Sequence, residues 1–351
     1  PVIKLTIFYN YIAFGHRSVV IMKKNGVLVA SALAVAVASF SAQAQAETVW
    51  KMAFNQTEGH PEMVAVQKFS EKLKQATNGE YSIEVFPNEL LGSQKETIEM
   101  VQNGSLEFSL IAGSLLENWS PDFAVFNLPY VFKDYKHLQR VVKDKSIVGD
   151  LFKSIENQGI TVLCAQYSGT RNVYTSKKEV KTPADLKGLK IRVMQSDTMV
   201  KMMNYMGGTG TPMGQGEVYT AIQTGVLDGA ENNEVTYYAL KQHEVGPIYN
   251  LTGHLMMPDY IITNTEFYNN LPAEVKKFFD ENLDSLVDDE FERFHAEVSS
   301  SLEKAKKEGT RVVQADQDAF KKAVEPLIAE KVNTPSAKAL YEAVQKARDA
   351  E

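Results

Sequence analysis

Two arginines have the chemistry and the surroundings of a site for an organic anion. Arg192 alternates with Ile191 and Val193, so we expect its side chain on the opposite face of a strand from theirs. Arg171 follows the segment 168–170, which we expect to cross between two domains. A guanidinium offers two parallel N–H donors that match a carboxylate. These residues predict a carboxylate site in an interdomain cleft, and an ordinary exposed strand arginine is the alternative for Arg192.

Asp228 and Glu231 are the pair of acids with a spacing that could serve catalysis. They stand three residues apart, so on a helix they would share a face and could act as general acid and base. A solvated helix end explains the same spacing, and we favour that interpretation. A periplasmic hydrolase built on this pair is the alternative function of a different class.

Common catalytic and cofactor signatures are absent from the sequence. It contains no G-x-S-x-G, no G-x-x-x-x-G-K-[ST] and no H-E-x-x-H, and the glycines at 207–214 have Met213 where a dinucleotide loop needs its third glycine. The single cysteine, Cys164, lies in an apolar run and is predicted to be a small buried strand residue. We predict no catalytic residue, metal or cofactor. Structural or surface roles are expected for His60, His137, His243, His254 and His295, since none has a further ligand at metal-binding spacing.

The charge balance excludes one class of partner. The 351 residues carry 37 Lys and Arg against 44 Asp and Glu, a formal charge of −7. Nucleic-acid binding depends on a basic surface that neutralises phosphates, so nucleic acid is not expected as a partner.

The beginning of the chain has the pattern of an export signal. Residues 22–46 contain a basic start, an apolar run of 14 residues and the cleavage signal Ala44-Gln45-Ala46. A membrane anchor is the alternative, but a membrane span needs roughly 20 apolar residues. We expect cleavage after Ala46, no membrane insertion and a periplasmic protein. Residues 1–21 precede a complete signal and are interpreted as an upstream extension that is not native. Removal of residues 1–46 leaves 33 basic and 44 acidic residues, a charge of −11, so an anionic ligand must be captured by a local cluster of cations.

Helical and strand-like segments alternate along the rest of the chain, which predicts an α/β fold. We expect two lobes joined by a hinge, with a long helix lying along both. Lobe I is predicted to comprise 47–168 and 258–297, and lobe II 169–257 and 298–351. The strand expected at 259–263 returns to lobe I. Other expected helices are 61–77, 93–104, 135–158, 198–206 and 217–227, the last with Val218, Ile222 and Val226 on one face; other strands are 49–54, 81–86, 107–112, 160–165 and 189–193.

The long helix is predicted from residues 272–308. Apolar residues recur every three or four positions there, and no glycine or proline interrupts them between Pro272 and Gly309. At ~1.5 Å per residue it would be about 55 Å long, so we expect it to lie along both lobes. A coiled-coil seam between two chains is the alternative.

The order of short motifs resembles one transporter receptor family over essentially all of residues 47–351. The amino-terminal half contains His60-Pro61, Lys68-Phe69, Thr77-Asn78-Gly79, Phe86-Pro87, Leu91-Gly92, Glu99, Gly104 and Leu106. The second half contains the segments 185–193, 212–213, 217–221 and 225–232. Together they resemble the DctP-type solute receptors of tripartite ATP-independent periplasmic (TRAP) transporters.

This resemblance implies the two-lobed periplasmic binding protein fold, with a hinge and a long helix spanning both lobes. It further implies a receptor that holds an organic acid between its lobes and delivers it to the transporter's membrane subunits. It also implies a monomer as the usual state. By position, it assigns the carboxylate salt bridge to Arg192 and further ligand contacts to Arg171, Asn232, Asn55 and Gln215. Weaker candidates for ligand contacts are His60, Tyr237 and His254.

Two features of the sequence predict the ligand class: a residue that differs from the family pattern, and a local resemblance to one branch of the family. Gln215 stands where several members carry an aromatic residue, and an amide that both donates and accepts favours a polyhydroxylated ligand. The segments 231–233, 237–238, 243–245, His254 and 258–259 resemble the branch that binds uronates and sugar acids. Sialic acid, C4-dicarboxylates and 2-oxo acids are the alternatives.

Overall fold

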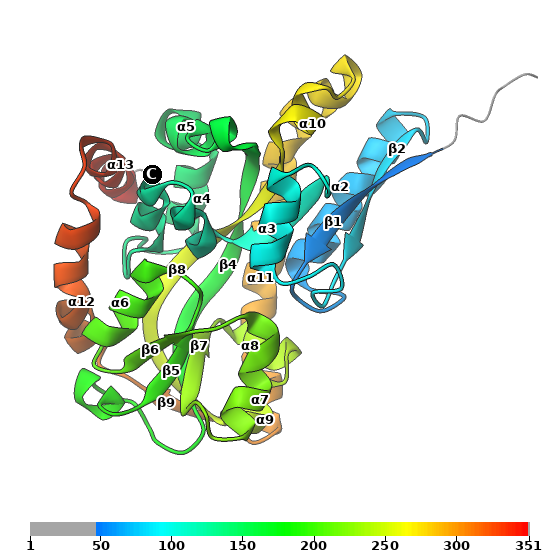
Figure 1. Ribbon diagram of the computed structural model, residues 1–351. Helices are drawn as coiled ribbons and strands as arrows, with labels where there is room; N and C mark the ends of the chain where they lie inside the picture. The colour runs from blue at the N-terminus through cyan, green and yellow to red at the C-terminus, as the bar shows by residue number, and fades with distance from the viewer. Residues whose placement is uncertain (1–46, 350–351) are drawn as a thin grey trace, which may run out of the picture. The chain divides into compact units, whose positions relative to one another are not determined.

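The computed structural model describes residues 47–349, and the predicted signal peptide and upstream extension lie outside them. Helices and strands alternate as expected (Figure 1). The strands are β1 (Thr48–Phe54), β2 (Tyr81–Phe86), β3 (Phe108–Ala112), β4 (Ile160–Thr175), β5 (Lys190–Val193), β6 (Thr209–Pro212), β7 (Gly229–Asn232), β8 (Ile248–Asn264) and β9 (Arg311–Gln314). The α-helices are α2 (Pro61–Ala76), α3 (Gln94–Gln102), α4 (Tyr135–Lys143), α5 (Lys145–Lys153), α6 (Asp197–Tyr205), α7 (Val218–Gln223), α8 (Glu234–Ala239), α9 (Gln242–Val245), α10 (Thr265–Asn269), α11 (Ala273–Lys307), α12 (Gln317–Lys331) and α13 (Pro335–Lys346).

Two long antiparallel strands, β4 and β8, connect the two halves of one sheet. The strand order is β2-β1-β3-β8-β4-β7-β5-β6, with β9 beside β8, and Figure 1 shows β4 and β8 running through the middle. On one side β1 is parallel to β2 and β3, and on the other β5 is parallel to β6 and β7. Each half is therefore an α/β unit, and the two-lobed α/β fold is confirmed. As predicted, 259–263 of β8 pairs with β3 of the first half.

The expected hinge at 168–171 lies inside β4 rather than in a loop. The register with β8 shifts between Tyr167 and Thr170 and again between Arg171 and Val173, so the strand is bulged where it crosses. Gly169 has φ +72°, and a Cβ there would lie 2.6 Å from the Cβ of Asn233. Both the backbone and the space therefore require glycine at this point. The described residues, 47–349, form one compact unit, so the predicted lobe boundaries stay a prediction.

The long helix α11 packs along both halves, as predicted. Its 35 residues correspond to about 52 Å at ~1.5 Å per residue. It contacts α2 of the first half, the crossing strand β4 and α8 of the second half. Phe279, Phe291 and Phe294 on its apolar face are fully buried within the chain. These side chains are thus part of the core and do not form a coiled-coil seam between two chains.

Local capping chemistry explains why several helices begin where they do. Ser93 and Glu96 form a capping box at the start of α3, as their spacing predicted. The helix predicted at 135–158 is divided into α4, α5 and a 3-10 turn at 156–158, so the prediction of one helix is wrong. Asp144 is extended and its side chain accepts from the Ser146 N–H, which ends one helix and begins the next.

The helix predicted at 217–227 is also shorter than expected. Helix α7 ends at Gln223, and Gly225 follows in a left-handed conformation at φ +75°. Val226 therefore does not share the buried face of Val218 and Ile222 and is 59% exposed. Cys164, in contrast, is a buried strand residue as predicted. No helix among residues 47–349 is both long enough and apolar enough to cross a membrane.

We predict that Phe279→Ala destabilises the fold by about 3–5 kcal/mol, because the ring fills a fully buried space between Phe69 and Phe108. The matched control, Val226→Ala, removes an exposed side chain and should stay within about 0.5 kcal/mol of wild type. Urea unfolding measures both. Equal effects of the two substitutions would contradict the assigned core.

Candidate ligand-binding site

Arg192 is a buried arginine with unused hydrogen-bonding capacity. It lies on β5 with only 2% of its surface exposed, and its Nε–H donates to the Met213 carbonyl oxygen at 2.9 Å. Among the described residues its two Nη groups make no hydrogen bond. Burial lowers the pKa of Arg192, while the negative charge of Glu231 opposes that shift. The guanidinium thus presents donors that an anion can fill, and the exposed-arginine alternative is wrong.

Arg171 uses most of its hydrogen-bond donors on Glu231, which lies on the adjacent strand β7. Its Nε donates to Glu231 Oε2 at 2.5 Å, and its Nη2 donates to Oε1 and to the Glu231 carbonyl oxygen at 2.9 Å each. Both side chains are buried. Burial alone would raise the pKa of Glu231, but Arg171 and then His254 lower it to about 2. This is a buried, charge-compensated pair.

The geometry of Glu231 overturns both interpretations of the acidic pair. Glu231 lies on a strand and is fully buried, so it is neither a general acid on a helix face nor a solvated helix end. Asp228 precedes that strand and its carboxylate accepts from the Lys190 N–H at 2.8 Å. The two acids therefore serve different structural contacts. Sequence analysis missed the pair with Arg171 because its members stand 60 positions apart.

Asn232 follows Glu231 at the end of β7 and is 2% exposed. Its Oδ1 accepts from the N–H of Asn233 at 3.0 Å, and its carbonyl oxygen accepts from the Tyr249 hydroxyl at 3.0 Å. Among the described residues its Nδ2 donates to no protein group. Asn232 is paired with Asn172 of β4, so its backbone lies beside the residue that follows Arg171.

A small cavity joins Arg192 to two residues from different segments. Gln215, in a 3-10 turn at 215–217, lines it, and the buried Gln215 Nε2 has no protein partner. Glu89, from the loop after β2, lines the same cavity. The N–H groups of Asn88 and Glu89 donate to the carbonyl oxygens of Gln56 and Phe54, which fixes this loop to the end of β1. Asn55, the first residue after β1, is buried beside that attachment.

Glu89 is the site residue that the sequence analysis missed. The signal that could have found it is its position just after β2, because parallel strands of an α/β sheet present ligand-binding loops at their carboxyl ends. The same rule places Asn55 after β1 and Asn232 at the end of β7.

Several contacts join the segments of the two halves around this cavity. The Gly216 N–H donates to the Glu89 carboxylate. Ser114 Oγ lies 3.3 Å from Met194 Sδ, and the Thr198 N–H donates to Glu117 Oε1 at 3.0 Å. The first-half segment 89–118 and the second-half segment 192–216 therefore touch across the site.

The three weaker candidates do not line the cavity of Arg192. Tyr237 lies in an aromatic cluster, and its hydroxyl donates to the Gly246 carbonyl oxygen at 2.8 Å, so its role in ligand binding stays a prediction. The Nε2 of His254 lies 3.5 Å from Glu231 Oε2, so His254 contacts the carboxylate of the ion pair and helps to lower its pKa. His60 is packed between Phe54 and Phe294 and lines a different groove, beside α8 and α11.

A second polar cluster lies beneath the site, where α2, β8 and α11 meet. Glu62, Asp259 and Glu290 are all at least 96% buried, and each has one carboxylate oxygen without a protein partner. Burial raises the pKa of Glu62 to about 8, and burial together with the Glu62 charge raises that of Asp259 and of Glu290 well above the ordinary value. Burial therefore favours the protonated form of all three acids. Among residues 47–349, no group of three acids, histidines or cysteines has the geometry to hold a metal ion.

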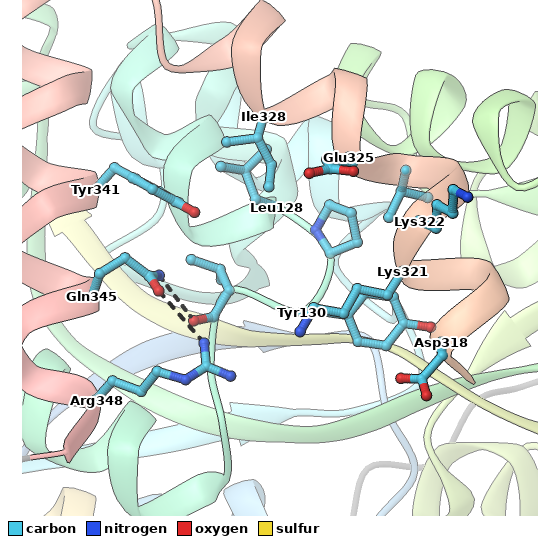
Figure 2. Close-up of a pocket in the computed structure, with 13 residues that line it drawn as sticks. Leu128, Tyr130, Asp318, Lys321, Lys322, Glu325, Ile328, Tyr341, Gln345 and Arg348 are labelled. Atoms are coloured by element: carbon cyan, nitrogen blue, oxygen red, sulfur yellow. Dashed lines mark hydrogen bonds between the residues drawn. The ribbon is translucent and has the colours of Figure 1, made fainter. Parts of the chain in front are cut away.

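A larger cavity, of about 450 Å³, lies away from Arg192 (Figure 2). It opens between residues 128–131 and helices α12 and α13. Figure 2 shows Gln345 donating to the Val131 carbonyl oxygen and accepting from Arg348. The Tyr130 hydroxyl donates to the Thr252 carbonyl oxygen at 2.9 Å, which ties the wall of the cavity to β8.

Comparison with known proteins identifies a family. Residues 52–334 match the model of DctP, bacterial extracellular solute-binding protein family 7. The C4-dicarboxylate-binding periplasmic protein DctP of Rhodobacter capsulatus is 32% identical over 275 residues, 77% of this chain and 78% of that protein.

Solved structures of TRAP periplasmic solute-binding proteins are similar throughout the described part of the chain. One from Anaerococcus prevotii, with bound D-glucuronate, is 36% identical with a TM-score of 0.84 and covers 86% of this chain and 99% of its own. Another from Xanthobacter autotrophicus, with bound β-D-galacturonate, is 34% identical with a TM-score of 0.81 and covers 85% and 99%.

The acid cluster predicts a specific pH dependence of stability. Because the pKa of Glu62 is higher in the folded than in the unfolded chain, the folded state binds the proton more tightly, and the free energy of unfolding falls as pH rises from about 5 to 8. Glu62→Gln should flatten this fall, as measured by urea midpoints at pH 5 and 8.

The control is Glu58→Gln, an exposed acid near the same helix start, which should keep the wild-type pH dependence. An unchanged slope in Glu62→Gln would mean that this carboxyl does not hold the proton.

Proposed function

Because the chain belongs to family 7 of the bacterial extracellular solute-binding proteins, the DctP family, we propose that it is a TRAP transporter receptor for a uronate. It captures the ligand between two lobes and delivers it to the membrane subunits. The two similar structures named above, one with D-glucuronate and one with β-D-galacturonate, support the ligand class. The other carboxylates named above are the competing ligands.

The observation that carries the proposal is Arg192. It is buried, its Nε is held by the Met213 carbonyl oxygen, and both Nη groups are free of protein hydrogen bonds among residues 47–349. A fixed guanidinium in a partly dry site binds a carboxylate through two charge-assisted hydrogen bonds. In our proposal it holds the carboxylate of the uronate.

Arg171 has a narrower role than its position in the family suggested. Its Nε and Nη2 are used on Glu231, so Nη1 alone remains for a ligand. Arg171 therefore adds at most the two N–H donors of Nη1 and a compensated charge.

Three amides are proposed to bind the hydroxyl groups. Asn232 and Gln215 each have an amide nitrogen without a protein hydrogen bond among the described residues, and Asn55 is buried at the end of β1. Amides both donate and accept, so they suit a polyhydroxylated ligand. Closing the lobes around the ligand excludes water and strengthens these bonds.

We also propose that the protein is exported to the periplasm after cleavage following Ala46, acts as a monomer and returns its ligand chemically unchanged. The family is extracellular, and its named relatives are binding proteins, which supports export and binding. The hydrolase alternative is weakened because its two acids, Asp228 and Glu231, are held in separate structural contacts.

We predict that D-glucuronate or D-galacturonate raises the melting temperature of the purified protein. A ligand at a hundred times its dissociation constant adds about 2.7 kcal/mol to the native state. Arg192→Ala should abolish the shift, and Arg192→Lys should weaken it, because an ammonium cannot form the paired bonds.

The matched control is Arg311→Ala, which removes an exposed strand arginine and should keep the shift. The panel includes sialic acid, C4-dicarboxylates, 2-oxo acids and neutral sugars, and the ligand is recovered and identified afterwards. A shift with neutral sugars alone, wild-type binding by Arg192→Ala, or a chemically altered ligand would overturn the proposal.

A further inference from the structure

The loop that carries Glu89 has an unusual backbone. Asn88 and Glu89 have φ angles of +58° and +55°, so two consecutive residues with side chains adopt the left-handed conformation. Such strain persists only where the surrounding structure imposes it, and it concentrates at ligand sites. Here the imposing contacts are the two N–H donations to the carbonyl oxygens of Gln56 and Phe54. The loop thus holds one acidic side chain in a fixed place.

The same small cavity is lined by Glu89 and by Arg192. Glu89 is half-buried and accepts the N–H of Gly216 from the other half of the sheet. A Cβ on residue 216 would lie 2.7 Å from Glu89 Oε2, so glycine is what permits the contact. The cavity is therefore lined by both a guanidinium and a carboxylate.

The carboxylate of Glu89 disfavours the binding of a second anion in this cavity. Besides Arg192, the charged groups that act on Glu89 are Glu96 and Glu217, both acidic. Of these three acids only Glu89 lines the cavity, whereas the side chains of Glu96 and Glu217 are exposed to solvent. A hydroxyl group can donate a hydrogen bond to Glu89, whereas an ionised carboxylate has no proton to donate and is repelled.

We propose that Glu89 makes the site selective for acids with a single carboxylate and hydroxyl groups, and that it excludes sugar dicarboxylates. The selectivity rests on the proposed function, since it requires the ligand's carboxylate on Arg192. The remote hydroxyl of the monoacid then donates to Glu89. In a dicarboxylate, the second carboxylate faces Glu89 and binding is weakened.

The test compares the dissociation constants of D-glucuronate and D-glucarate, the latter carrying a second carboxylate. Calorimetry is used for wild type, Glu89→Gln and Glu217→Gln. Differences between ring and open-chain ligands cancel when the ratio of the two constants is compared across variants. We expect wild type to bind glucuronate at least a hundredfold more tightly than glucarate. In Glu89→Gln the ratio should fall at least tenfold, and in the control Glu217→Gln it should stay within about threefold of wild type.

Gly216→Ala provides an independent variant in case Glu89→Gln does not fold. Its new methyl group displaces the Glu89 carboxylate and should also lower the ratio. An unchanged ratio in the folded variants, or an equal fall in Glu217→Gln, would overturn the role of Glu89 while glucuronate binding by wild type upholds the receptor. Failure of wild type to bind any sugar acid would overturn the proposed function and this inference together.

Discussion

The buried pair of Arg171 and Glu231 is the interaction on which the site depends. Two charges removed from water are stable only when each compensates the other and their remaining hydrogen-bonding groups are used. Here the guanidinium makes three hydrogen bonds to Glu231, and His254 approaches the same carboxylate. The pair fixes β7 to β4 where β4 crosses between the halves of the sheet. Asn232, the next residue of β7, is positioned by the same register.

This arrangement explains how an acidic protein can bind an anion. One buried arginine is neutralised within the protein, and the other, Arg192, keeps its Nη groups free of protein hydrogen bonds among the described residues. In our proposal the carboxylate of Glu89, which lines the same cavity, disfavours a second anion there. Attraction is thus confined to one wall of the site, while the net charge of the chain opposes anions at long range.

Local patterns predicted the fold well and the site in part. Apolar residues that recur every three or four positions predicted α11, and the spacing of Ser93 and Glu96 predicted the start of α3. Both signals are local in the sequence. The same local reasoning misplaced Glu231 on a helix, since its partner Arg171 is distant in sequence. Tyr237 was assigned to the site by family position, yet its hydroxyl is used inside an aromatic cluster. The position of Glu89 just after β2 is its one sequence signal, and this signal does not single it out, because the left-handed loop and the contact with Gly216 exist only in the folded chain.

The central claim is that Arg192 is the carboxylate-binding group of a uronate receptor. A crystal structure of the protein with D-glucuronate tests it most directly. The account predicts both carboxylate oxygens within hydrogen-bonding distance of the Arg192 Nη groups, with Arg171 still bound to Glu231 and the ligand enclosed by both halves. A ligand whose carboxylate lies away from Arg192, or which occupies the cavity between α12 and α13 instead, would contradict it.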